Sequence, residues 1–78
     1  MNETAQRKAS ALRTMLEMME VPDRRLDTSA PANIRWLNRN LRINNADHPL
    51  FETAKELVLW LMIHNEKGAT TNRSKPVC

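Results

Sequence analysis

The sequence predicts an all-α domain of three helices that is followed by a disordered C-terminal tail. The chain has 78 residues and contains one Gly, and its four Pro residues lie at the edges of the apolar segments or in the tail. Apolar residues recur at spacings of three and four, which is typical of helices that bury one face. No strand pattern with a partner strand accompanies them, so helices are expected throughout the domain.

The first helix is predicted over residues 3–20, with Asn2 as its N-cap. Its apolar stripe, at about 100° per residue, consists of Ala5, Ala9, Leu12, Leu16 and Met19, widened by Met15. Val21 ends the helix, because a residue that precedes proline disfavours the helical conformation. Residues 22–30 form a polar connector, and Leu26 is expected to anchor it in the core.

The second helix is predicted over residues 31–43, with Pro31 at its first position, where the missing N–H costs nothing. One apolar face is formed by Ile34, Leu37 and Leu41. Trp36 and Ile43 lie together on a nearly opposite side of the helix. One apolar face is enough for this helix to contribute to an internal core. The second face, formed by Trp36 and Ile43, is therefore expected to have a role other than packing in that core.

The third helix is predicted over residues 49–67, with Asp47 or His48 as its cap and Gly68 as its terminator. Its packing seam has four-three spacing, which is typical of helices that cross at a shallow angle. The seam consists of Leu50, Ala54, Leu57, Leu61 and His64.

Residues 57–63 are apolar around the whole helix circumference. A helix that is apolar on every side is expected to be buried on every side. Residues 69–78 show no apolar period and are expected to form the disordered tail. The domain is therefore placed at residues 1–68.

These helices carry more apolar surface than one small core can hide. Large exposed apolar patches usually mark contacts between proteins, and Trp is enriched at the centres of such contacts. The predicted contact residues are Trp36, Ile43, Leu59, Trp60 and Ile63. A homodimer that joins two third helices is the simplest closed arrangement. In the alternative interpretation, irregular packing buries both tryptophans inside one chain.

A basic stripe of Arg35, Arg39 and Arg42 lies on the second helix, and Arg24 and Arg25 of the connector are placed to extend it. Such a stripe suits phosphate contacts or an acidic protein partner. A helix-turn-helix reader is excluded, because its recognition helix would carry the apolar residues 57–63 where polar, base-reading residues belong.

Catalysis and cofactor binding are not expected from this sequence. It has no Gly-rich loop, no paired carboxylates, and no Ser or Cys with a partner His at a known spacing. The two histidines have no neighbouring ligand cluster, so no metal site is predicted. One cysteine cannot form an internal disulfide, and no signal peptide or membrane-spanning segment is visible, so a cytoplasmic location is expected.

The sequence therefore predicts a small non-enzymatic module that acts by protein–protein contact, as an adaptor, inhibitor or regulator, and associates with itself. Its size is common among phage and mobile-element accessory proteins. The alternative is a small nucleic-acid-binding regulator that uses the arginine stripe.

Overall fold

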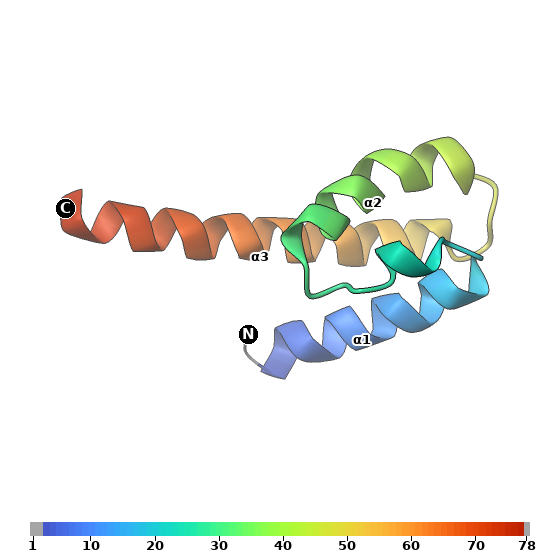
Figure 1. Cartoon of the computed structure of the whole chain (residues 1–78), viewed down its shortest axis with the longest axis horizontal. Helices are drawn as coiled ribbons and strands as arrows, with labels where there is room; N and C mark the ends of the chain where they lie inside the picture. Colours follow the sequence, from blue (N-terminus) through green and yellow to red (C-terminus); the bar gives the residue numbers. More distant parts are fainter. Residues whose placement is uncertain (1–2, 78) are drawn as a thin grey trace.

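The structure, a computed structural model, describes residues 3–77, with side chains described as far as Glu66. Within this part, three α-helices and one short 3-10 helix form: α1 (Glu3–Met18), η1 (Asp23–Arg25), α2 (Pro31–Asn44) and α3 (Phe51–Val77). The predicted all-α class is confirmed. Figure 1 shows that α1 and α2 run in the same direction, whereas α3 runs the opposite way and packs against both.

The core lies where α3 meets the other two helices. Its largest fully buried side chains are Leu12, Leu16, Ile34, Leu37, Val58 and Leu61. The stripes predicted for the first and second helices are both in this core, and Met15 packs at its edge. A single core in so short a chain is marginal, so each of these side chains carries a large share of the stability.

The end of α1 is a tight reversal that the sequence pattern did not predict. The helix stops at Met18 rather than at the expected residue 20. Glu20 has φ 60°, and the N–H groups of Val21 and Glu20 donate to the carbonyls of Leu16 and Glu17 at 3.1 and 3.2 Å. This is a Schellman motif, which usually places Gly at the left-handed position. A Glu there costs conformational energy because its Cβ is crowded.

The connector between α1 and α2 is fixed at two points. Leu26 is buried, as predicted. The Thr28 hydroxyl donates a buried hydrogen bond of 2.7 Å to the Ala9 carbonyl of α1. A buried polar group requires such a partner, so this bond holds the connector against α1.

The start of α3 differs from the prediction in its first residue and in part of its buried stripe. The helix begins at Phe51 rather than at residue 49, so Pro49 lies in the turn before it. Within this turn the His48 Nδ1 accepts a hydrogen bond from the Leu50 N–H at 3.0 Å.

Up to Glu66, the side chains buried along α3 are Phe51, Ala54, Val58 and Leu61. Two members of the predicted seam, Ala54 and Leu61, are therefore confirmed. Leu50 and Leu57 are only partly buried, and their neighbours Phe51 and Val58 are buried instead. The predicted stripe and the buried stripe are adjacent on the surface of α3, and the positions of α1 and α2 determine which of them is buried.

The end of α3 also differs from the prediction. The helical backbone of α3 continues through Gly68 to Val77, beyond the expected end at residue 67. The disordered tail expected at residues 69–78 stays a prediction. A Gly inside a helix costs only about 1 kcal/mol, and the next proline is Pro76. Cys78 lies outside the described residues, and the division of the chain at residue 68 stays a prediction.

Candidate functional site

The outward side of α3 is the first candidate contact surface. Leu59 and Ile63, one helical turn apart, are 36% and 55% exposed. At 100° per residue, Glu52, Glu56 and Glu66 share this side, and all three are exposed. We call these five residues the α3 outer face. The expectation that residues 57–63 are buried on every side is therefore wrong for the single chain, because α1 and α2 cover only one side of the helix.

Trp60 is less exposed to a partner protein than the sequence predicted. It is partly buried, and its ring stacks on that of His64 at 5.1 Å between ring centroids. The Lys8 Nζ of α1 lies 5.2 Å from the Trp60 ring centroid, which is within the range of a cation–π contact. The chain thus supplies intramolecular partners for this tryptophan, as in the internal alternative considered above.

Trp36 is likewise partly buried and packs against the edge of the core. The Arg25 guanidinium lies 4.7 Å from its ring centroid. Ile43, by contrast, is 72% exposed near the end of α2. Leu59, Ile63 and Ile43 are therefore the predicted contact residues that the fold leaves most open. Met18, at 64% exposed, is a further open apolar side chain at the end of α1.

The predicted arginine stripe is divided between two hollows in the surface. Arg35 and Arg39 share the first hollow with Arg25, which was expected to extend the stripe, whereas Arg24 does not line it. The side chains that line this hollow, here named the α2 basic hollow, are Arg25, Ala32, Arg35, Trp36, Arg39 and Asn40.

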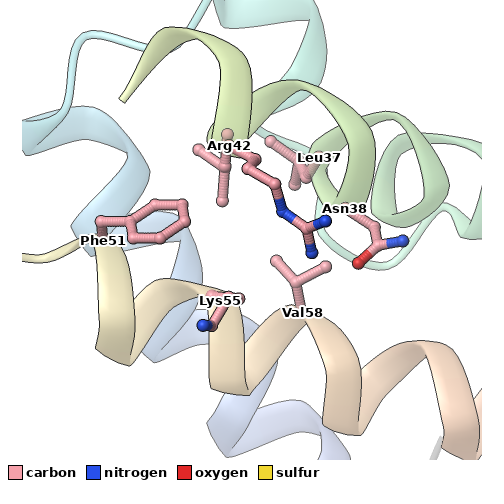
Figure 2. A pocket seen from close by; sticks show the side chains of 7 residues that line it. Leu37, Asn38, Arg42, Phe51, Lys55 and Val58 are labelled. Atoms are coloured by element: carbon pink, nitrogen blue, oxygen red, sulfur yellow. The ribbon is translucent and has the colours of Figure 1, made fainter. Parts of the chain in front are cut away.

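Arg42 belongs to the second hollow, between α2 and α3. Figure 2 shows Arg42 extending from α2 toward Asn38 and Val58, with Phe51 and Lys55 on the α3 side. Lys55 is held by Glu52 at 3.1 Å, whereas Arg42 has no ion pair among residues 3–66. Arg42 therefore lines a different hollow from Arg35 and Arg39, although helical spacing keeps all three on one side of α2.

No group of three or more His, Cys, Asp or Glu side chains that could hold a metal ion occurs among the residues whose side chains are described. In the same part of the chain, no helix is both long enough and apolar enough to cross a bilayer. The chain matches no protein-family model, no curated protein and no solved structure with which it was compared.

Proposed function

We propose that this chain is a protein-interaction module whose α3 outer face binds an amphipathic helix of a partner protein. The observation that carries the proposal is the pair of large apolar side chains, Leu59 and Ile63, left open within an otherwise core-forming segment. Apolar side chains open in this way gain free energy when a partner covers them, at about 25 cal/mol per Å². A helix laid on such a face is a recurring mode of recognition.

The flanking charges determine which helix fits. Glu56 lies one turn before Leu59, and Glu66 lies about one turn after Ile63, and both are exposed. A partner helix with an apolar stripe bordered by Lys or Arg would complement this face, since charge complementarity selects partners and orients them. The partner is therefore expected to be basic where it borders the apolar contact.

The same charges disfavour the simplest homodimer. An antiparallel pair of α3 helices that placed Leu59 against Ile63 of a second copy would also place Glu56 against Glu66 of that copy. Like charges in such positions repel each other. A second copy of the chain, which the sequence favoured as the partner, is thus the competing occupant of this face.

The test uses designed, fluorescently labelled helical peptides with a Leu stripe, bordered either by Lys or by Glu, and measures anisotropy. We expect the Lys-bordered peptide to bind at least tenfold more tightly. Ile63→Ser should weaken its binding, and Glu56→Lys combined with Glu66→Lys should reverse the preference for border charge. Glu17→Lys is the control for each of these two substitutions taken singly, because it makes the same charge change as one of them, on α1, where the Arg13 pair at 3.8 Å is exposed and weak.

Three results would overturn the proposal. The first is equal affinity for both peptides, and the second is a change in peptide affinity on Glu17→Lys as large as that on Glu56→Lys or Glu66→Lys. The third is a dimer detected by analytical ultracentrifugation that Ile63→Ser converts to monomer, which would show that a second copy occupies the face.

A further inference from the structure

We propose that the α2 basic hollow binds the phosphodiester backbone of a nucleic acid. This site is independent of the α3 outer face and uses a different helix. Three guanidinium groups, those of Arg25, Arg35 and Arg39, line one hollow, and no acidic side chain lines it.

The positive charge of the hollow is not neutralised within the described chain. None of its three arginines forms an ion pair among residues 3–66, whereas Arg7 and Arg13 of α1 each pair with a glutamate. Cations gathered on one surface repel each other and attract an anion to the same place. The hollow therefore favours a negatively charged ligand.

Arg25 is held in place before any ligand arrives. It lies over Trp36, and its Nη1 donates to the Asn33 Oδ1 at 3.2 Å. The Asn33 amide in turn donates to the carbonyls of Arg24 and Asp27 at 3.3 and 3.1 Å. A side chain ordered in this way loses less entropy on binding.

Arg25 also has hydrogen-bonding capacity that the protein leaves unused. Its Nε is buried and has no hydrogen-bond partner among the described residues. A buried donor without an acceptor is uncommon in folded proteins. A small adjustment of this side chain around an oxyanion would give the donor an acceptor.

The chemistry of the hollow favours phosphate over an aromatic base. Guanidinium groups present planar pairs of N–H donors that match phosphate oxygens. The Arg25 guanidinium lies 4.7 Å from the centroid of the partly buried Trp36 ring, which also packs against the core, so this indole is already in contact with protein groups where a base would stack. Recognition would thus be directed to the backbone and be independent of base sequence.

The spacing of cations along α2 favours a polymer with repeated phosphates over a single one. Arg42, in the neighbouring hollow, adds a further unpaired cation one turn beyond Arg39. Successive arginines along one helix can meet successive phosphates of the same strand. A free nucleotide carries the same group but would occupy only part of this surface.

The experiment measures anisotropy of labelled duplex and single-stranded DNA over a series of salt concentrations. We expect affinity to fall steeply with salt, and Arg35→Ala and Arg39→Ala each to reduce the salt slope by about one. Arg7→Ala and Arg13→Ala are the matched controls, because they remove the same charge from α1, and should leave the slope unchanged.

No binding at low salt would overturn the proposal, as would equal losses for the α1 and α2 variants. Tighter binding of ATP, or of a phosphorylated peptide, than of the oligonucleotide would also overturn it, by assigning the hollow to another source of phosphate. Arg25→Gln should weaken DNA binding and leave binding of the Lys-bordered peptide unchanged. Failure of this proposal would therefore leave the proposed function of α3 standing.

Discussion

The α3 outer face and the α2 basic hollow are two surfaces of one small fold with opposite chemistry. The first is an apolar pair, Leu59 and Ile63, bordered by glutamates, and the second is a hollow lined by three arginines and Trp36. They also differ in construction. The α3 outer face belongs to a single helix, whereas the α2 basic hollow needs Arg25 from η1, eleven positions before Trp36 in the printed sequence. A rearrangement of the connector between α1 and α2 would leave the α3 outer face intact, because one helix carries it, but would disrupt the α2 basic hollow.

The largest loss of stability should come from a substitution on the buried side of α3. Unfolding of the chain would then remove both surfaces together. Leu61 is fully buried, and Leu61→Ala is expected to lower the free energy of unfolding by about 2–5 kcal/mol. Ile63→Ala, two positions away but 55% exposed, should change it by less than about 0.5 kcal/mol. Urea denaturation followed by circular dichroism measures both. A large loss of stability for Ile63→Ala would show that the α3 outer face serves the fold of the single chain.

A second variant should weaken binding at one of the two surfaces more than at the other. Thr28→Val removes the buried hydrogen bond to the Ala9 carbonyl and is expected to cost about 0.5–1.5 kcal/mol, the usual net contribution of an intramolecular hydrogen bond. The loosened connector should weaken DNA binding more than peptide binding, because Arg25 lies in it. Thr14→Val is the control, since the Thr14 hydroxyl donates to the Ser10 carbonyl at an exposed position. Equal weakening of DNA binding and peptide binding would contradict the conclusion that the α2 basic hollow depends on the connector.

A third variant should stabilise the fold and leave both surfaces unchanged. Glu20→Gly places the residue with least steric cost at φ 60° and is expected to raise the free energy of unfolding by up to about 1 kcal/mol. Ala11→Gly, at an exposed position inside α1, should instead lower it by about 1 kcal/mol. Thermal melts of the two variants provide the measurement. A lower melting temperature for Glu20→Gly would mean that the Glu20 side chain makes a compensating contribution.

The smallest expected effect depends on pH and lies in the connector. Hydrogen bonds from the Ser29 side chain and backbone N–H lower the pKa of Asp27 below its ordinary value of 3.8. A carboxyl whose pKa is lowered on folding stabilises the fold above pH 3.8, and this contribution is lost as the pH falls from 3.8 through the folded pKa. Ser29→Ala should therefore be slightly less stable than the natural chain at neutral pH. The difference should shrink well below pH 3.8, as measured by urea denaturation, whereas Ser10→Ala should show no such trend.

Local pattern was enough to predict the helices and most of the core. The apolar stripes of the first two helices are in place because a spacing of three and four residues defines a face within one helix, whatever surrounds it. Leu59 and Ile63 were predicted as contact residues from the excess of apolar surface, not from helical spacing. In the apolar segment 57–63, however, several stripes compete, so the sequence alone does not show which side α1 and α2 cover.

The sequence by itself determined the fold class, the approximate helices and the excess of apolar surface. Tertiary structure decided which of two adjacent stripes of α3 is buried, the left-handed turn at Glu20, the intramolecular partners of both tryptophans, and which hollow each arginine lines. It also brought Arg25 to Trp36. The physical reason is distance along the chain. Helical periodicity relates residues within about two turns, whereas contacts between η1, α2 and α3 depend on how the connectors let the helices pack.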